Sequence, residues 1–249
     1  MGVRALPLGT SRSLAGIASL GYGSIDARTI IGFDVPLNTI QNILVANVAQ
    51  PVLSFLYFSY NGLFTCMLLG YEWSSYAYHR KGLRVSHPAV GDQRSTYFLQ
   101  LPYRFALPLM ALSGILHWLV SQSIFLVAVE IYAWDGSRPA LPYRGADGWR
   151  ACGYSPIAIL TVIILGSVMV LAIIGFGFVP YKQGMNIAGS CSTAISAACH
   201  LVEDEVDGHT ATMKKLQWGV VRMSAEGVGH CAFSTKEVDF PRKGEMYAG

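Results

Sequence analysis

Residues 157–180 read IAILTVIILGSVMVLAIIGFGFVP, without a single charged side chain. An α-helix rises about 1.5 Å per residue, so a stretch of this length covers the roughly 30 Å hydrocarbon core of a bilayer. A helix on the surface of a soluble protein needs a polar face, which this stretch lacks. The stretch therefore predicts a membrane-spanning helix.

The composition of the whole chain agrees with a membrane protein. Of its 249 residues, 52% are hydrophobic and 13% are charged, whereas soluble domains carry about 25% charged residues. The formal net charge is only +3, and no run of Lys and Arg is dense enough to track a phosphate backbone. We therefore expect no nucleic-acid partner.

Two further stretches, residues 51–70 and 105–129, are long and carry no Asp, Glu, Lys or Arg. Together with residues 157–180 they predict an all-α membrane protein with about three transmembrane helices.

The domain organisation follows from these spans. We expect an N-terminal segment, 1–42, that is poorly ordered or partial, followed by the transmembrane bundle over residues 43–180. Residues 181–249 are predicted to form a small soluble tail. Within the tail, residues 216–223 and 230–234 are candidates for a β-hairpin, because a turn separates two short apolar stretches.

Basic residues set the expected orientation. The loop 71–104 and the tail hold twelve of the 18 Lys and Arg residues, and a three-span topology places both on one side. The positive-inside rule assigns them to the cytoplasm, in the plasma membrane or an endomembrane. The external N-terminus then requires a reverse signal-anchor, unless the chain is the C-terminal part of a longer multi-pass protein.

A polar face interrupts the second span. Ser113, His117 and Ser121 recur at four-residue spacing and share one helix face, with Gln122 beside them. Polar groups at mid-bilayer face a partner helix or a water-filled cavity. They therefore form hydrogen bonds between helices, or they line a path for protons or a solute with His117 as the titrating group. The first interpretation is favoured, because no carboxylate lies at this depth to pass a proton onward.

Four basic residues border the predicted spans: Arg80, Lys81, Arg84 and Arg104. Long basic side chains keep their stems in apolar surroundings and their charges at the lipid head groups, so we interpret these four as membrane-interface anchors. Two alternatives stay open. Arg104 could bind a substrate, and the cluster 80–84 could bind anionic lipid head groups.

The sequence contains no recognisable motif of an enzyme or a cofactor site. Cys199–His200 and His230–Cys231 are adjacent pairs, whereas zinc knuckles carry ligands roughly two to four residues apart. We therefore predict no catalytic residue, no cofactor and no metal site.

Several stretches resemble one protein family. They are residues 54–77, 80–88, 93–127, 153–159 and 188–200, followed by WGV, GHCAFS and YAG towards the C-terminus. In their order and spacing these resemble the C-terminal half of fungal multi-pass membrane proteins that carry the domain of unknown function 6536, over residues 42–249. The resemblance implies a lineage and a place in the membrane, but no activity, cofactor or catalytic residue.

Taken together, the residues predict an integral membrane protein with a non-enzymatic, structural or regulatory role. The alternative is a component of a transporter or channel that uses the Ser113/His117/Ser121 face. A membrane-embedded enzyme has the least support, because no carboxylate lies inside a predicted span. The expected partners are the lipid bilayer and either further copies of the chain or other membrane subunits.

Overall fold

The computed structural model describes residues 13–31, 37–129, 149–200 and 207–248. The chain divides into two compact units: residues 1–60 with 108–174 (unit 1) and residues 61–107 with 175–249 (unit 2). The protein is mixed α/β, with about 49% helix, 18% strand and three sheets among the described residues. The all-α prediction is therefore wrong, because the polar tail and part of the apolar sequence form paired strands.

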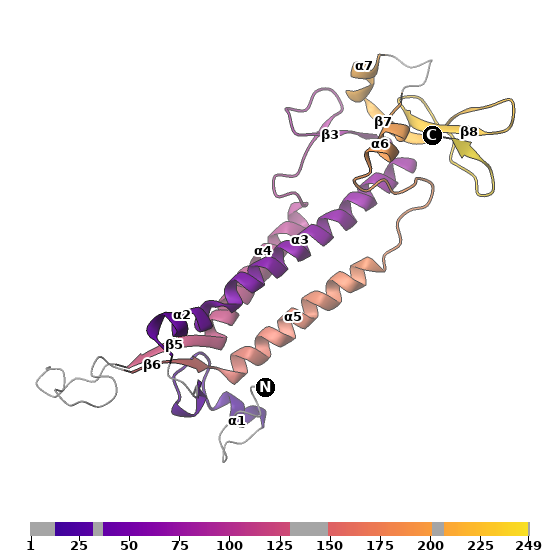
Figure 1. Ribbon diagram of the computed structural model, residues 1–249. Coiled ribbons are helices and arrows are strands. Elements are labelled where there is room, and N and C mark those ends of the chain that lie inside the picture. Colours follow the sequence, from indigo (N-terminus) through magenta and orange to yellow (C-terminus); the bar gives the residue numbers. More distant parts are fainter. Residues whose placement is uncertain (1–12, 32–36, 130–148, 201–206, 249) are drawn as a thin grey trace, which may run out of the picture. The chain divides into compact units, whose positions relative to one another are not determined.

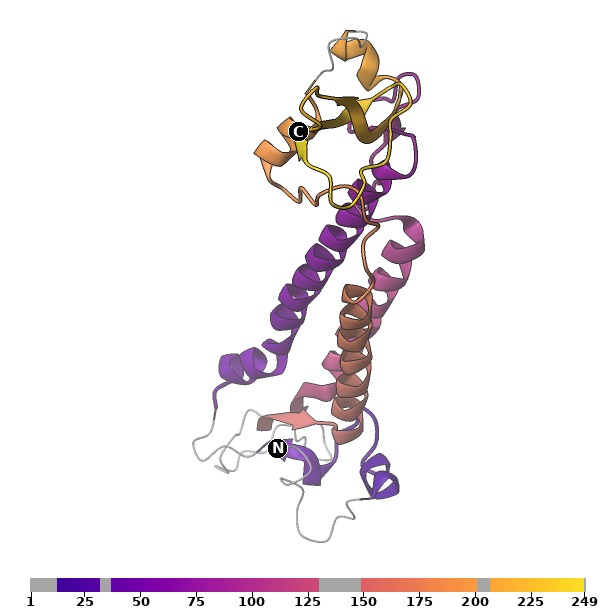
Figure 2. The same cartoon turned by 90° about the vertical axis from the view of Figure 1, so that its right-hand side faces the viewer.

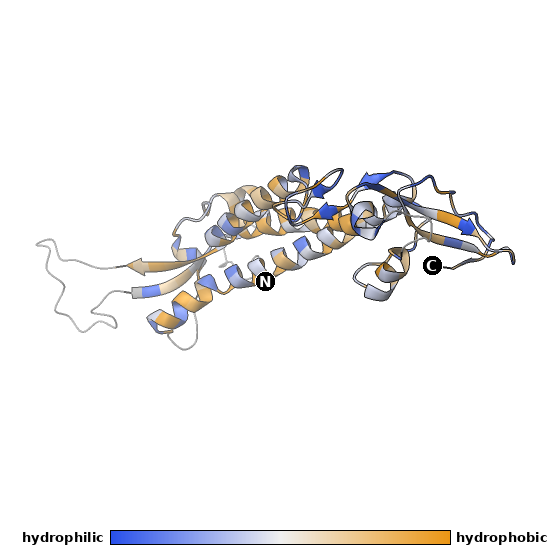
Figure 3. Ribbon diagram, turned by 90° about the horizontal axis from the view of Figure 1, so that it is seen from above, coloured by the Kyte–Doolittle hydropathy of each residue, from blue (hydrophilic) through white to orange (hydrophobic). Residues whose placement is uncertain are grey.

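Within the described residues, three helices are long and apolar enough to cross a membrane, which fits a membrane location. The first runs over Thr39–Ala77 and includes α2 (Thr39–Asn47) and α3 (Ala49–Ser74). The other two are α4 (Tyr103–Ser123) and α5 (Pro156–Gly177). Figure 3 colours much of these helices as hydrophobic, with pale and blue turns between the orange ones. Many of their large side chains are open to the surroundings; Leu171 of α5, for example, is 67% exposed.

The second predicted span is part helix and part strand. α4 ends at Ser123, and the next residues form β5 (Ile124–Val129). The carbonyl of Ser123 accepts a hydrogen bond from the N–H of Ser155 at 2.9 Å, beside the pairing of β5 with β6 (Trp149–Tyr154). A short apolar run rich in β-branched residues fits either a strand or a continuing helix, so hydrophobicity did not reveal this boundary.

Unit 1 contains an antiparallel sheet with the strand order β1–β6–β5, in which β1 is Ile30–Ile31. Helix α2 lies beside β5 and β6 (Figure 1). A capping box between Asn38 and Gln41 fixes the start of α2. The thiol of Cys152 in β6 donates to the carbonyl of the buried Asn42 at 3.2 Å, which ties the helix to the sheet.

The described part of the N-terminal segment also packs within unit 1. Ile17 of α1 (Leu14–Ala18) and the buried Leu20 contact Ile157 near the start of α5. The ring of Tyr22 stacks on Trp118 of α4, with ring centroids 5.9 Å apart. A 3-10 turn, η1 (Ala27–Thr29), then leads into β1.

Unit 2 contains a sheet with the strand order β2–β7–β8–β9. β7 (Lys215–Met223) and β8 (Gly229–Ser234) form an antiparallel hairpin, so the predicted hairpin is confirmed. β2 (Lys81–Gly82) pairs with β7, which joins the loop 71–104, called the basic loop below, to the tail. β9 (Tyr247–Ala248) runs parallel to β8.

Two short helices adjoin this sheet. α6 (Ser192–Ala198) contacts β8, and α7 (Gly208–Thr212) contacts β7; Figure 2 shows them in orange beside the yellow strands. The tail therefore folds into a small α/β structure.

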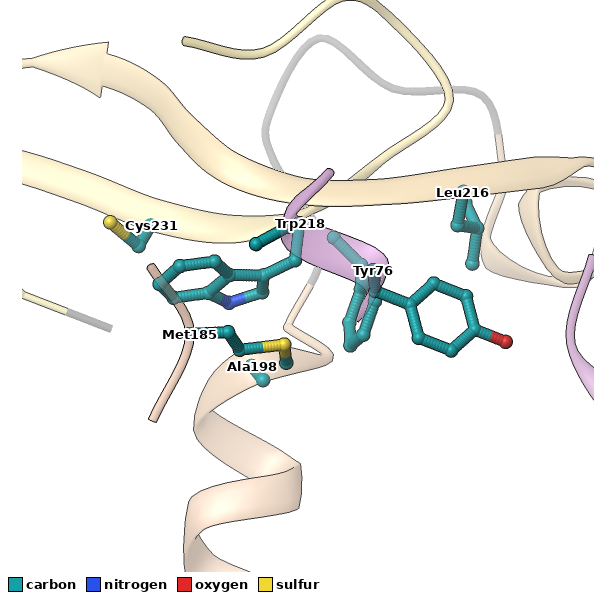
Figure 4. Close-up of a cluster of buried hydrophobic side chains, with 8 residues drawn as sticks. Tyr76, Met185, Ala198, Leu216, Trp218 and Cys231 are labelled. Atoms are coloured by element: carbon teal, nitrogen blue, oxygen red, sulfur yellow. The ribbon is translucent and has the colours of Figure 1, made fainter. Parts of the chain in front are cut away.

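Trp218 lies in the core of unit 2 (Figure 4). Its side chain is 7% exposed and belongs to one cluster with Met185, Ala198 and Cys231. Among the described residues, the indole N–H of Trp218 has no acceptor. A buried donor without a partner costs about 1–3 kcal/mol, so the apolar packing around this ring has to outweigh that cost.

Three aromatic rings join the long helices within unit 2: Phe64 of α3, Phe105 of α4 and Phe176 of α5. Their centroids lie 5.2–6.4 Å apart in edge-on arrangements, and Phe64 is buried. Such pairs contribute about 0.5–1.5 kcal/mol beyond the area they bury. Shape-matched packing of this kind is what holds helices together where the solvent is itself apolar.

Candidate functional site

Two short strands bring distant basic residues together in unit 2. β3 (Arg84–Val85) and β4 (Arg94–Ser95) pair in parallel, with Arg84 opposite Arg94. The backbone N–H of Arg94 donates to the carbonyl of Leu83 at 2.8 Å. The loop between β3 and β4 is held to the tail, because the N–H of Asp92 donates to the carbonyl of Met213 at 2.8 Å.

Both guanidinium groups bind Glu72, near the end of α3. Nε of Arg84 lies 2.8 and 2.9 Å from the two carboxylate oxygens, and an Nη atom of Arg94 lies 2.8 Å from Oε1. The side chain of Glu72 is 23% exposed and those of Arg84 and Arg94 are 23% and 34% exposed. The three charges are thus partly shielded from water. Their hydrogen bonds are charge-assisted, and such bonds are roughly twice as strong as those between neutral groups.

Further contacts fix the orientation of the two arginines. Arg84 donates to the carbonyl of Ser95 at 2.9 Å, and its guanidinium lies 4.0 Å from the ring centroid of Tyr97. Nε of Arg94 donates to the carbonyl of Gly82 at 2.9 Å. Each guanidinium is therefore held on more than one side.

Two more cations adjoin this cluster without a carboxylate of their own. The ammonium group of Lys81 donates to the hydroxyl of Ser75. Burial lowers the pKa of Lys81, and the charge of Glu72 opposes that shift. The guanidinium of Arg104, in the first turn of α4, lies 4.7 Å from the ring centroid of Phe105. Among the described residues, neither Lys81 nor Arg104 forms a salt bridge.

All four cations border one cavity of about 540 Å³, which we call the basic pocket. Among the described residues, the whole lining belongs to unit 2, and Glu72 is its single carboxylate. Leu68 and Leu69 of α3 supply an apolar wall. The volume lies in the range of small-ligand sites, about 300–1,000 Å³, and the excess of positive charge favours an anion.

Gln100, on the wall of the basic pocket, has a strained backbone. Its φ is 62°, in the left-handed region that side chains other than glycine rarely adopt. Its N–H donates to the carbonyl of Tyr97 at 3.1 Å, and the next residue, Leu101, is 2% exposed. Strain of this kind costs on the order of 1–3 kcal/mol and is most frequent at functional sites.

The structure separates the four predicted membrane anchors. Lys81, Arg84 and Arg104 line the basic pocket, whereas Arg80 lies outside it and donates to the carbonyl of Lys236. Sequence reasoning missed Arg94 and Glu72 as site residues. A carboxylate at the end of an apolar helix was visible in the sequence, but no spacing pattern linked it to either arginine.

His117, from the predicted polar face of α4, contacts α3 within unit 1. Its Nδ1 lies 2.6 Å from Oε1 of Gln50, and Nε2 of Gln50 donates to the backbone carbonyl of His117 at 3.2 Å. This reciprocal pair joins the two helices. The geometry supports the interpretation that His117 ties helices together.

The other residues of this face make only local contacts. The hydroxyl of Ser121 donates to the carbonyl of Trp118 at 2.7 Å, and Gln122 donates to that hydroxyl at 3.3 Å. Within the described part of the chain, the side chain of Ser113 forms no hydrogen bond. The polar face is therefore not a continuous chain of hydrogen bonds along α4.

The two Cys–His pairs of the tail meet through their histidines. His200, which follows α6, and His230 of β8 face each other through their Nε2 atoms, with ring centroids 4.5 Å apart. Burial, followed by the charges of His200 and Arg222, lowers the pKa of His230. All five cysteines are free thiols, and the described residues contain no group of three side chains placed to hold a metal ion.

Comparison with known proteins identifies a family. A family model described as Domain of unknown function (DUF8419) matches residues 7–237. No curated protein and no solved structure matches the chain. The resemblance to proteins with the domain of unknown function 6536 stays a prediction. Because the matched region covers nearly the whole sequence, the chain belongs to the DUF8419 family.

Proposed function

We propose that this chain is a multi-pass integral membrane protein that binds a phosphate-bearing anion in the basic pocket, with a structural or regulatory rather than an enzymatic role. The helices α3, α4 and α5 are its membrane spans, and the pocket lies where α3 ends and α4 begins.

The exposure of the long helices supports membrane insertion. Ile163, Leu171 and Ile174 of α5 are each about half or more exposed, at 58%, 67% and 49%. Soluble proteins rarely expose contiguous apolar surface of this extent, whereas lipid tails cover it without cost.

The basic pocket is the observation that carries the anion-binding proposal. Within the part of the chain that the structure describes, four basic side chains surround the cavity and a single lining carboxylate, Glu72, offsets them. A guanidinium presents its donors in a planar fork that matches two oxygens of one phosphate group. A concave site with this donor set and charge excess suits a phosphate-bearing anion better than a cation or a neutral ligand.

The state of Glu72 favours binding over catalysis. A general base needs a free lone pair directed at the proton it removes. The carboxylate of Glu72 already accepts three hydrogen bonds from Arg84 and Arg94. The pocket therefore offers positive charge and hydrogen-bond donors around a carboxylate that is already engaged by Arg84 and Arg94.

Transport along the face of Ser113, His117 and Ser121 remains the second candidate, with less support. The ring Nδ1 of His117 is engaged with Gln50, and the described hydrogen bonds do not link the three residues. We retain inter-helix bonding as the role of His117, the one residue of this face whose described hydrogen bonds reach α3.

The cytoplasmic side is proposed for the basic pocket and for the tail. β2 of the basic loop pairs with β7 of the tail, so both segments share one side. Together they hold twelve of the 18 Lys and Arg residues, as the positive-inside rule expects for cytoplasmic segments. The lipid bilayer, and further copies of the chain or other membrane subunits, are the proposed partners.

A thermal-shift titration tests the proposed function. The full chain, purified in a neutral detergent without phosphate, is heated with and without sodium pyrophosphate, with sodium chloride at matched ionic strength as the salt control. Pyrophosphate should raise the unfolding midpoint of wild type and of Arg80→Gln, whose residue lies outside the pocket, and should raise that of Arg104→Gln much less. Equal shifts in all three proteins, or none, would contradict the proposal.

A further inference from the structure

We infer that the anion held by the basic pocket is the phosphomonoester head group of a membrane lipid. This inference rests on the proposed function and narrows its ligand from any phosphate-bearing anion to an anionic lipid.

The lining of the basic pocket changes from charged to apolar along α3. Glu72 and Tyr71 lie at the charged end, and Leu69, Leu68 and Thr65 continue the lining back along the helix. Leu69 is 57% exposed. A soluble anion would leave this apolar wall uncovered, whereas the hydrocarbon chain of a lipid would cover it while the head group meets the cations.

The position of the pocket fits the level of lipid head groups. Its walls include the last turns of α3, Pro102 immediately before α4 and Arg104 in the first turn of α4, and both helices are apolar enough to span a membrane. Tyr71 and Tyr97 also line the cavity, and tyrosine is enriched at the boundary between hydrocarbon and water.

The charges favour a phosphomonoester over a phosphodiester. An incoming head group competes with Glu72, which already neutralises part of the charge of Arg84 and Arg94. A phosphodiester carries one negative charge, no more than Glu72 itself. A phosphomonoester has a second ionisation near pH 6 and carries about −1.5 to −2 charges at neutral pH, with three terminal oxygens for the donors around it.

Lys81 and Arg104 are the two basic residues of the pocket that are available to pair with a bound head group. Neither forms a salt bridge among the described residues, so both can meet a second negative charge without losing an existing ion pair. Arg84 and Arg94 remain oriented by the backbone carbonyls of Ser95 and Gly82.

The test compares four probes on the purified full chain in neutral detergent: dioleoyl phosphatidic acid, dioleoyl phosphatidylglycerol, dioleoyl phosphatidylcholine and soluble glycerol 3-phosphate. Dissociation constants are measured by native mass spectrometry for the lipids and by titration calorimetry for glycerol 3-phosphate. Phosphatidic acid should bind at least about tenfold more tightly than each of the other three, the effect of one additional charge-assisted contact or a covered apolar wall.

Matched variants locate the binding. Arg104→Gln and Lys81→Gln should each weaken phosphatidic acid binding by about tenfold or more. Arg80→Gln removes the same charge from the same loop outside the pocket and should leave the constant unchanged. Using two pocket variants keeps the test decisive if one of them folds poorly, since the unfolding midpoint is recorded for each.

The possible results separate the lipid inference from the proposed function. If glycerol 3-phosphate binds as tightly as phosphatidic acid, the lipid inference fails and anion binding stands. If both anionic lipids bind alike and Arg80→Gln weakens them as much as Arg104→Gln, the lipids respond to general surface charge and the inference also fails. If no phosphate compound binds, the proposed function fails with it.

Discussion

The carboxylate of Glu72 holds two guanidinium groups, so its charge should have opposite effects on stability and on binding. In Glu72→Gln, Arg84 and Arg94 lose their shared counter-ion, and we expect the protein to lose about 1–3 kcal/mol of unfolding free energy. The same change removes the one negative charge that competes with a ligand. Affinity for pyrophosphate should therefore rise while the thermal unfolding midpoint falls.

Glu226→Gln supplies the matched control, because Glu226 is exposed in the turn between β7 and β8. It should change neither quantity. If Glu72→Gln lowered stability and affinity together, the carboxylate would be part of the ligand site rather than a competitor for it.

His117 gives the second prediction at this scale. His117→Gln keeps a side-chain donor and acceptor for Gln50, whereas His117→Leu leaves Gln50 with its amide oxygen unpaired. We expect a loss of about 1–2 kcal/mol in the Leu variant and little change in the Gln variant, measured by thermal unfolding in detergent. Ser113→Ala should be neutral. Reconstituted wild type that carried a proton flux abolished by His117→Gln, with stability intact, would instead establish the transport interpretation.

At the scale of elements, β2 depends on a glycine. A Cβ on Gly82 would lie 1.8 Å from the carbonyl oxygen of Asp92, so Gly82→Ala must displace the loop that carries Arg94. We expect this variant to lose pyrophosphate binding and to be cut more rapidly by protease within residues 83–97. Gly62→Ala, on α3 with no atom near its Cβ position, is the control and should bind normally. Normal binding by Gly82→Ala would show that the pocket does not need the β2–β7 register.

His230 of β8, which faces His200 after α6, predicts that the stability of the protein depends on pH. The pKa of His230 lies below its ordinary value of 6.5, mainly because of burial and then because of His200 and Arg222. The unfolded chain therefore binds a proton more readily than the folded one, and stability should fall as the pH drops below about 6.5 through the lower folded pKa. Above that range the contribution of His230 to stability should be constant.

Thermal unfolding at pH 7.5 and pH 5.5 checks this. His230→Gln should reduce the difference between the two midpoints, and His87→Gln, at an exposed position in the basic loop, should not. An unchanged difference in His230→Gln would assign the pH dependence to other groups.

The elements differ in how far the sequence could predict them. The long helices were predictable, because uncharged runs such as residues 157–180 exceed any ordinary strand. Residues 124–129 were not, because a short β-branched run forms a strand only when a partner such as β6 satisfies its backbone. The basic pocket was hidden for a similar reason. Arg84 and Arg94 meet through two-residue strands, which are too short to leave a periodic pattern.

At the scale of the whole molecule, the pairing of β2 with β7 predicts one accessible side for the loop and the tail. In sealed, right-side-out membrane vesicles, a membrane-impermeant maleimide should leave Cys191, exposed in the tail, and an introduced His87→Cys unlabelled until the membrane is opened. Inside-out vesicles should label both at once. Labelling of the two sites from opposite sides would contradict the shared sheet, and labelling of both from outside would reverse the proposed orientation.

The unpaired indole N–H of Trp218 also makes the core of unit 2 optically readable. An indole that is shielded from water and lacks an acceptor emits at shorter wavelength than one in solvent, and Trp218 meets both conditions among the described residues. In a variant whose other four tryptophans are replaced by phenylalanine, a shift of this emission to longer wavelength would therefore report the opening of the β7–β8 hairpin without an added label. The donor that costs the fold some stability is also an intrinsic fluorescent probe of the tail that carries it.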